Sequence, residues 1–346
     1  MKEIRDIINH LSAYKTLSRK EAQQILSDIA EGKYSETEMA AFLTIYLMRN
    51  VTVDELIGFR DALLEHCQQI DLGTDTLIDL CGTGGDSKDT FNISTLASFV
   101  AAGAGAKVAK HGNFGVSSNC GSSNVLEFFG CEFTNDENIL KSQLKESGIC
   151  FLHAPLFNPA MKNIAPVRKK LKVKTFFNML GPMVNPARPQ KQMAGVFSLE
   201  IARLYNYIYQ KGNTDFVIIH SLDGYDEISL TGDFKSIDRS GEHLYSPKDI
   251  GYSCIDPKLI IGGKDVPSSA LIFKQILDGK GSQEQNAVVI SNAAFALQAY
   301  FDCNLKVAQA RAEESLMSGH AKTAFNSLIE LSKRSHGKHI ESNSIA

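Results

Sequence analysis

The sequence predicts an α/β fold in which a small all-helical domain precedes a larger α/β domain, whose central, mostly parallel sheet is flanked by helices. Two observations carry this prediction. Residues 1–70 contain only helical patterns, whereas from residue 76 short β-rich runs alternate with helical stretches. That alternation is typical of a parallel or mixed sheet with helices on its faces. A chain of 346 residues is also too long for one small core and suits either one large α/β domain or two domains.

Composition argues against several classes of protein. The net charge of −3 gives no long-range attraction for nucleic acid, so any phosphate group must be bound by a local cluster of donors. Seven scattered cysteines without a CxxC pair favour reduced thiols in the cytoplasm over disulfides or a zinc site. The N-terminus has no apolar signal segment, and no apolar run approaches the roughly 20 residues of a membrane span. We therefore expect a cytoplasmic protein without a nucleic-acid or membrane partner.

The N-terminal region carries three helix starts of the capping-box type, in which a hydroxyl and a carboxylate satisfy each other's backbone donors. They are Ser18 with Glu21, Ser35 with Glu38, and Thr52 with Glu55. The helix over residues 39–47 has a broad apolar stripe. This stripe packs either on the rest of its own domain or on a second subunit.

The larger domain is predicted as an ordered series of strands and helices. In sequence order these are strand 77–81, helix 92–103, strand 107–110, helices 125–129 and 137–148, strand 150–152, helix 159–171, a turn-rich loop 178–186, strand 194–197, helix 199–209, strands 216–220 and 227–231, and helices 286–301 and 305–319. We expect residues 336–346 to form a frayed tail.

Two polar turns follow the first two strands of this series. The turn GTGGD at 82–86 lets backbone N–H groups approach an anion, and a helix that starts near Ser94 adds its N-terminal dipole. Lys110 ends the second strand and adds a positive charge, while serine hydroxyls at 117–118 and 122–123 follow it. Parallel strands deliver both turns to one sheet edge. The pattern indicates a site for several phosphate groups; the alternative is a structural glycine turn with solvated serines.

The glycine turn does not fit the two best-known phosphate loops. No GxxxxGK[ST] occurs, which excludes a P-loop nucleotide hydrolase. A dinucleotide fingerprint would need glycine at position 87, where serine stands, and an acidic residue where the second strand ends in Lys110.

An acidic pair, Asp226 and Glu227, follows the strand that ends in His220. Oxygen ligands of this kind suit a hard cation, and a polyphosphate ligand usually carries Mg²⁺. The sequence therefore predicts a magnesium site; the alternative is a turn with a charged strand start.

An ordered set of motifs resembles the anthranilate phosphoribosyltransferase family. The motifs are GTGGD at 82–86, TFNIST at 90–95, KHGN at 110–113, NPAMK at 158–162, PVR at 166–168, FNMLGP at 177–182, NP at 185–186 and DGYDE at 223–227. They cover the chain from about residue 1 to 335 in the family's order. No single motif is decisive, but the ordered set is highly specific.

The resemblance implies an architecture and a set of partners. Residues 165–190 would join 1–70 in the helical domain, and 71–164 with 191–335 would form the α/β domain. The family usually forms a homodimer through the helical part. Its substrates are anthranilate and phosphoribosyl pyrophosphate, and its cofactor is Mg²⁺, here expected as two ions. A separate glutamine amidotransferase of anthranilate synthase is a further possible partner.

The resemblance also assigns site residues. The phosphoribosyl pyrophosphate contacts would be Gly82, Gly85, Asp86, Thr90, Asn92, Ile93, Ser94, Thr95, Lys110, Ser118 and Ser122. The anthranilate contacts would be Gly82, Asn113 and Arg168, where a guanidinium suits a carboxylate. Ser94, Asp226 and Glu227 would bind the metal. Lys110, Asp226 and Glu227 would stabilise charge in catalysis, and no general base is assigned.

Several positions depart from the family's commoner pattern. Phe114 replaces an arginine, Asn158 a histidine, His153 a phenylalanine, Ser87 a glycine and Asn124 an aspartate. The missing arginine puts affinity and acceptor choice in doubt, but not catalysis. His111 and His153 are interpreted as hydrogen-bonding pocket residues, with proton transfer as the alternative.

Two other functions remain open at this point. One is a pyrimidine nucleoside phosphorylase-like enzyme of the related fold, which would take free phosphate and depend less on the Asp226–Glu227 pair. The other is a non-catalytic relative that binds nucleic acid, against which the net charge argues.

Overall fold

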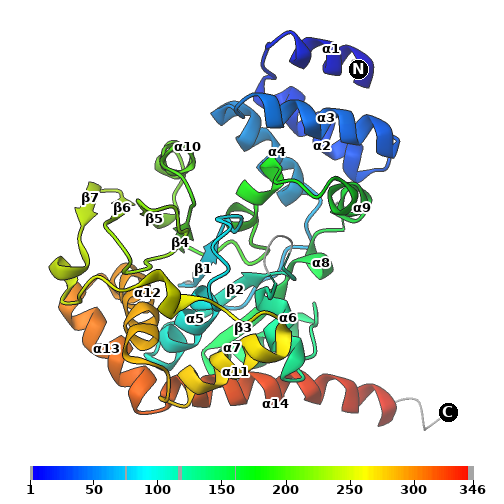
Figure 1. Ribbon diagram of the computed structural model, residues 1–346. Helices are drawn as coiled ribbons and strands as arrows, with labels where there is room; N and C mark the ends of the chain where they lie inside the picture. Colours follow the sequence, from blue (N-terminus) through cyan, green and yellow to red (C-terminus); the bar gives the residue numbers. More distant parts are fainter. Residues whose placement is uncertain (1–2, 75, 116–118, 160, 342–346) are drawn as a thin grey trace.

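A helical bundle sits at one end of the molecule and a larger α/β domain forms the rest (Figure 1). The computed structural model describes residues 3–74, 76–115, 119–159 and 161–341. The bundle comprises α1 (Ile4–Ser12), α2 (Arg19–Ala30), α3 (Glu36–Met48) and α4 (Val53–Glu65). The three predicted capping boxes are confirmed, because the side chains of Ser18, Ser35 and Thr52 accept the N–H three residues on in α2, α3 and α4.

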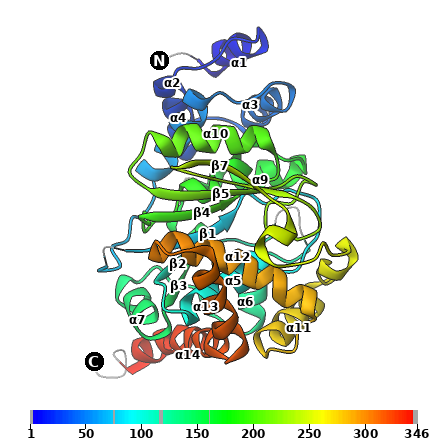
Figure 2. The same ribbon diagram turned by 90° about the vertical axis from the view of Figure 1, so that its left-hand side faces the viewer.

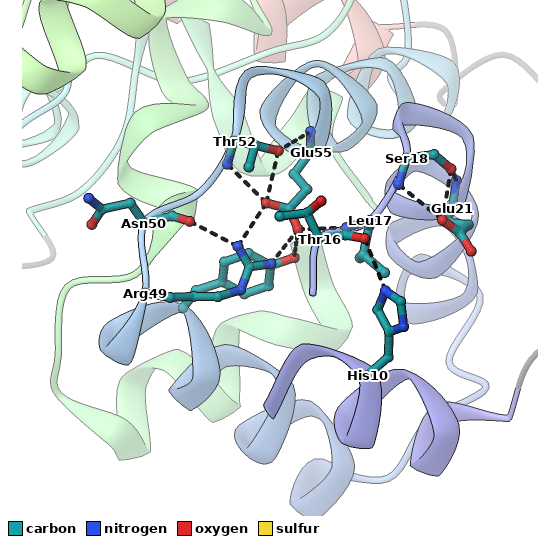
Figure 3. A network of polar contacts seen from close by, with 10 residues as sticks. His10, Thr16, Leu17, Ser18, Glu21, Arg49, Asn50, Thr52 and Glu55 are labelled. Carbon is teal, nitrogen blue, oxygen red and sulfur yellow. Dashed lines mark hydrogen bonds and ion pairs between the residues drawn. The ribbon is translucent and has the colours of Figure 1, made fainter. Parts of the chain in front are cut away.

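Glu55 is the polar centre of the bundle (Figure 3). Its Oε1 accepts hydrogen bonds from the Leu17 N–H at 3.0 Å and the Tyr46 hydroxyl at 3.1 Å, and the carboxylate pairs with Arg49. Burial opposes the charge of Glu55, but Arg49 and the donated N–H groups hold its pKa below the usual value. One carboxylate thus caps α4 and ties it to α3 and to the α1–α2 connection.

The sheet confirms the predicted fold class. Its seven strands lie in the order β3-β2-β1-β4-β5-β6-β7. The strands are β1 (Ile78–Gly82), β2 (Val108–Gly112), β3 (Ile149–His153), β4 (Lys191–Gly195), β5 (Asp215–Ser221), β6 (Phe234–Asp238) and β7 (Gly241–Tyr245). The first five are mutually parallel and the last two pair antiparallel. Strand order reverses at β1, with β2 on one side and β4 on the other, and ligands of α/β proteins bind at such a point.

Helices cover both faces of this sheet (Figure 2). Those of the larger domain are α5 (Ile93–Gly103), α6 (Ser122–Phe128), α7 (Glu137–Ser147), α8 (Ala154–Phe157), α10 (Leu199–Gln210), α11 (Val266–Leu277), α12 (Gln283–Phe301), α13 (Leu305–Met317) and α14 (His320–Glu341). Helix α9 (Met161–Leu171) packs on α2 and α3 of the bundle instead. Helices α5 and α12 to α14 share one hydrophobic core with the sheet. Helix α10 lies between the sheet and the bundle (Figure 2).

A second core joins the bundle to the α/β domain. Phe176, in a 3₁₀ turn after α9, stacks on Phe59 of α4 with ring centroids 4.3 Å apart. Ile164 and Val167 of α9 and the inner face of α10 belong to the same buried cluster. This packing supports the assignment of residues 165–190 to the helical domain, and the domain boundaries themselves stay a prediction.

The structure corrects one strand and adds elements that the pattern did not indicate. Residues 227–231 are not a strand, because Asn292 of α12 bonds both the N–H and the carbonyl of Ile228 at 3.0 and 2.9 Å, leaving them outside the sheet ladder. The antiparallel strands β6 and β7 and helices α1, α8, α11 and α14 were not predicted. Strand β4 begins at Lys191, three residues before its predicted start.

The C-terminal segment also differs from expectation. Helix α14 continues to Glu341, through much of the expected frayed tail, and residues 342–346 lie outside the described part of the chain. Within the described ranges no helix combines the length and apolarity needed to cross a bilayer.

Candidate active site

A crevice opens where β1 and β4 end, and Asp226 fills its floor. A Cβ atom added to Gly82, the last residue of β1, would lie 2.5 Å from Asp226 Oδ2, and one added to Gly195 would overlap the Asp226 carbonyl. Glycine at both strand ends therefore admits the acidic segment into the switch point of the sheet. Ser94 and Glu227 line the same small pocket.

The two carboxylates are bonded to the amides expected to face phosphate. Asp226 Oδ2 accepts the Gly84 N–H at 2.7 Å, and Glu227 Oε1 accepts the Ser94 N–H at 3.0 Å. These two amides are therefore paired with carboxylates in this structure, and their role toward an anion stays a prediction. A carboxylate that lies beside a glycine turn or a helix N-terminus is stabilised by accepting hydrogen bonds from the backbone N–H groups there.

Negative charge is concentrated at this end of the crevice. Burial raises the pKa of Asp226, and the neighbouring Asp86 raises it further; burial and Asp226 do the same to Glu227. Within the described ranges, no three acidic, histidine or cysteine side chains already form a metal-ligand cluster. Carboxylate oxygens whose ionisation is opposed by burial and by one another nevertheless fit a hard divalent cation.

Lys110 lies between this acidic end and the core. Its side chain is buried, and its Nζ donates to the Leu80 carbonyl at 2.7 Å. It is close enough to Glu227 to oppose the rise in that carboxyl's pKa. The predicted phosphate lysine is thus buried beside β1, with its Nζ held by the Leu80 carbonyl.

The end of β2 is held by two neighbouring segments, the loop at Gly181 and the start of α6. His111 Nδ1 lies 3.1 Å from the Gly181 carbonyl, and burial lowers the pKa of His111 to about 4, so the ring is neutral. Nδ1 then carries the proton, because a carbonyl can only accept. Asn113 is tied to the start of α6, since its N–H donates to Ser122 Oγ at 3.2 Å.

Arg168 of α9 presents an unpaired guanidinium. Its Nη2 donates weakly to Asn178 Oδ1 at 3.4 Å, and the group lies over the Phe177 ring at 5.1 Å. No carboxylate in the described part of the chain forms a salt bridge with it, and burial lowers its pKa to about 10. Asn178 Nδ2 would lie 3.7 Å from a Cβ on Gly85, so Arg168 reaches the glycine turn through Asn178.

Two of the positions that depart from the family pattern, Phe114 and His153, lie together beside the ends of β2 and β3. The His153 ring stacks on Phe133 with centroids 4.4 Å apart and meets Phe114 edge-on at 4.9 Å. His153 Nδ1 is 2.8 Å from Ser123 Oγ, and burial lowers its pKa to about 4. Phe114 therefore makes aromatic contacts where the arginine of the commoner pattern would place a positive charge. Asn158 is buried, and its Oδ1 has no partner among the described residues.

The remaining predicted contacts differ in what they can offer a ligand. Asn92 Nδ2 donates to the Cys120 carbonyl at 3.0 Å, and Thr90 forms an isolated bridge with Ile261. The side chains of Ile93 and Thr95 are buried, so these residues can contribute only backbone atoms. Ser118 lies outside the described residues.

Sequence reasoning missed four residues that shape this site: Asp79, Lys174, Asn178 and Asn185. Lys174 lies within 3.6 Å of a Cβ placed on Gly85, and Asn185 bonds Asp79. A carboxylate inside the apolar run of β1 is the signal that could have found Asp79. Asn178 and Asn185 lie in the predicted turn-rich loop, for which the sequence pattern indicates no role in the site.

Comparison with known proteins identifies the family. Residues 5–67 match the helical bundle domain of a glycosyl transferase family, and residues 74–322 match its a/b domain. An anthranilate phosphoribosyltransferase from Christiangramia forsetii is 54% identical over 330 residues, which cover 95% of this chain and 100% of that protein. One from Flavobacterium johnsoniae is 55% identical over 329 residues, with 95% and 100% covered. The chain belongs to the anthranilate phosphoribosyltransferase family.

Solved structures agree with this family membership. Anthranilate phosphoribosyltransferase from Thermus thermophilus has a TM-score of 0.87 and 29% identity, covering 94% of this chain and 99% of that one. The Saccharomyces cerevisiae protein, in complex with PRPP and Mg, has a TM-score of 0.87 at 24% identity, covering 96% and 98%. Membership of the anthranilate phosphoribosyltransferase family confirms the resemblance and favours it over the phosphorylase and nucleic-acid-binding alternatives.

Proposed function

We propose that the protein transfers the phosphoribosyl group of phosphoribosyl pyrophosphate to the amine of anthranilate, with release of pyrophosphate, in tryptophan biosynthesis. The observation that carries this proposal is the polarity of the crevice. One end holds the buried Asp226 and the half-buried Glu227, and the segment beside the glycine turn holds the Arg168 guanidinium, which has no salt-bridge partner among the described residues. A metal-bound pyrophosphate suits the first and an aromatic carboxylate suits the second.

We assign the ligand contacts on this basis. Phosphoribosyl pyrophosphate would contact Gly82, Gly85, Asp86, Thr90, Asn92, Ile93, Ser94, Thr95, Lys110, Ser118 and Ser122. Anthranilate would contact Gly82, Asn113 and Arg168. The glycine turn, the start of α5 and the end of β2 supply most of these groups, which supports a single two-substrate site.

The acidic residues fit a magnesium site. Ser94, Asp226 and Glu227 would hold the metal, which we expect as two ions, and the mutually raised pKa values of the carboxyls indicate that a cation would stabilise them. When bound, Mg²⁺ would neutralise charge on the pyrophosphate.

The chain's own residues need only position the two substrates and stabilise the charge that develops on the leaving group. The aniline nitrogen is neutral near pH 7, so it attacks the ribose C1 without prior deprotonation while the bond from C1 to the pyrophosphate oxygen breaks. The attacking nitrogen becomes strongly acidic and loses its proton to solvent. Lys110 would stabilise the charge that builds on the leaving group, and Arg168 would orient the acceptor.

The decisive test is consumption of anthranilate fluorescence on mixing with phosphoribosyl pyrophosphate and Mg²⁺. We expect the fluorescence to decay for the wild type. The Asp226→Asn, Glu227→Gln double variant should fold normally by circular dichroism and turn over several orders of magnitude more slowly. Persistent anthranilate fluorescence with consumption of another aromatic amine would refute the acceptor assignment, and near-normal activity of the double variant would refute the metal assignment.

We further infer a cytoplasmic homodimer that associates through the helical domain. Exposed apolar side chains at the end of α3, Leu47 and Met48, and Tyr14 after α1 support this surface as the interface. A separate glutamine amidotransferase partner, which would belong to the enzyme that makes anthranilate, stays a prediction.

A further inference from the structure

Side chains bridge β1 and β2 where the two strands approach the crevice. The strands are in register at Ile78 and Val108. Nearer the crevice, Asp79 Oδ1 accepts the His111 N–H at 3.1 Å, and the Leu80 carbonyl accepts from Lys110 Nζ at 2.7 Å. The spacing of the two strands at the site therefore depends on side-chain length and charge as well as on the backbone ladder.

Asn185 completes this bridge from a third segment. Its Nδ2 donates to Asp79 Oδ2 at 2.9 Å and to the Ala109 carbonyl at 2.8 Å, and its Oδ1 accepts the Ala187 N–H at 2.9 Å. The same loop supplies the Gly181 carbonyl that lies 3.1 Å from His111 Nδ1. Asp79 and Asn185 thus join β1, β2 and the 181–187 loop at one point.

The bridge is buried and charged. Asp79 is fully buried, and Asn185 and Lys110 are 3% and 2% exposed. Burial raises the pKa of Asp79 to about 6, against the opposing effects of Lys110, Asn185 and the His111 N–H, so the carboxylate is ionised near pH 7.5. An ionised carboxylate can accept from both donors at once, whereas an amide at this position could accept through only one atom.

We propose that Asp79 and Asn185 are positioning residues for phosphoribosyl transfer, holding the end of β2, from Lys110 to Asn113, at a fixed distance from the glycine turn of β1. The inference rests on the proposed function. Neither residue contacts a substrate; they act through Lys110 and His111. A displacement of about 1 Å in such a segment can cost roughly 100-fold in rate, because both substrates lose their alignment.

The test is Asp79→Asn, which keeps the shape of the side chain but turns one acceptor into a donor. We expect kcat/KM for phosphoribosyl pyrophosphate to fall by roughly 100-fold, with a raised KM. A purely structural residue would instead lower the folded fraction, which reduces the maximal rate and leaves KM unchanged.

Asp28→Asn is the matched control. Asp28 is a carboxylate with 1% exposure that is bonded to Gln24, Lys33 and Tyr34 within the bundle, so the same substitution also disturbs a buried polar cluster. Its kinetic constants should match the wild type well below its melting temperature. Wild-type KM values in Asp79→Asn would overturn the inference, as would a KM below the wild-type value, which would indicate an electrostatic rather than a positioning role.

A second variant keeps the test decisive if Asp79→Asn does not fold. Asn185→Ala removes the bridge from the loop side and should raise the same KM; an unchanged KM would overturn the inference. Calorimetric titration of phosphoribosyl pyrophosphate with Mg²⁺ into each variant gives a readout independent of anthranilate. A wild type that binds this ligand without consuming anthranilate would refute the proposed acceptor, yet weaker binding by Asp79→Asn would still support the positioning role.

Discussion

Ser87 departs from the glycine of the commoner family pattern, and the departure strains the local backbone. It has a φ of 62°, the left-handed region in which glycine is favoured, and it follows Gly84 and Gly85, which also have positive φ. The commoner glycine at this position is therefore explained by backbone conformation. Asp89, in the same loop, has a φ of 48°. The loop is strained but anchored, since Gly262 N–H donates to the Asp89 carbonyl at 2.7 Å.

Ser87→Gly should stabilise the protein by about 0.5–1 kcal/mol. Relief of roughly 1–2 kcal/mol of left-handed strain outweighs the extra entropy that glycine gives the unfolded chain. Urea unfolding followed by circular dichroism measures the difference. Ser142→Gly, inside α7, is the control and should be destabilising. A destabilised Ser87→Gly variant would show that contacts of the serine outweigh its backbone strain.

At the scale of single elements, the helix caps of the bundle are alike in sequence but unequal in energy. The boxes of α3 and α4 have the same geometry, with the third-residue carboxylate bonded to the cap N–H at 2.8 Å for Glu38 and 2.9 Å for Glu55. Glu38 serves only its own helix start, whereas Glu55 also binds Arg49, Tyr46 and the Leu17 N–H. Of the two carboxylates, Glu55 is therefore the one that joins different elements of the bundle.

Glu55→Gln should destabilise the protein by about 3 kcal/mol, because it leaves the buried Arg49 guanidinium without its counter-charge. Glu38→Gln makes the same chemical change at an exposed cap and should have a far smaller effect. Thermal unfolding of both variants gives the comparison. Equal shifts would mean that capping alone, and not the buried pair in Figure 3, accounts for the contribution of Glu55.

At the scale of the whole molecule, the bundle and the α/β domain are joined through a shared core. Phe176 packs against Phe42, Tyr46 and Phe59 of the bundle, while Asn178, two residues on, lies beside Arg168 and near the glycine turn. The segment that completes the bundle core thus also approaches the glycine turn. We therefore expect the stability of the bundle and the geometry of the proposed acceptor side to be coupled.

Phe176→Ala should cost about 3–4 kcal/mol, since it removes a buried ring from four aromatic neighbours. We expect a single unfolding transition in both wild type and variant, and a raised KM for anthranilate in the variant. Circular dichroism during urea unfolding and steady-state kinetics measure the two effects. Two separate transitions in the wild type would show that bundle and α/β domain unfold independently.

Much of this protein is determined by short-range sequence features. Each capping box acts within three residues, glycines mark the turns, and apolar periodicity marks the helices and strands, so the bundle helices and the parallel sheet could be predicted locally. The ordered motifs identified the family for the same reason. Lys110 stood out because it ends an apolar strand, and the acidic pair Asp226–Glu227 because it lies in the turn segment after the strand that ends in His220.

Tertiary structure alone decided how these residues are paired. Gly84 and Asp226 are 142 residues apart and Ser94 and Glu227 are 133 apart, yet each pair shares a hydrogen bond that occupies an amide expected to face phosphate. The same applies to Ile228, whose bonds to Asn292 replace a strand ladder, and to Asp79 with Asn185. Periodicity shows which groups are polar or buried, but a buried donor bonds whichever acceptor the fold brings to it, and that is settled only when distant segments meet.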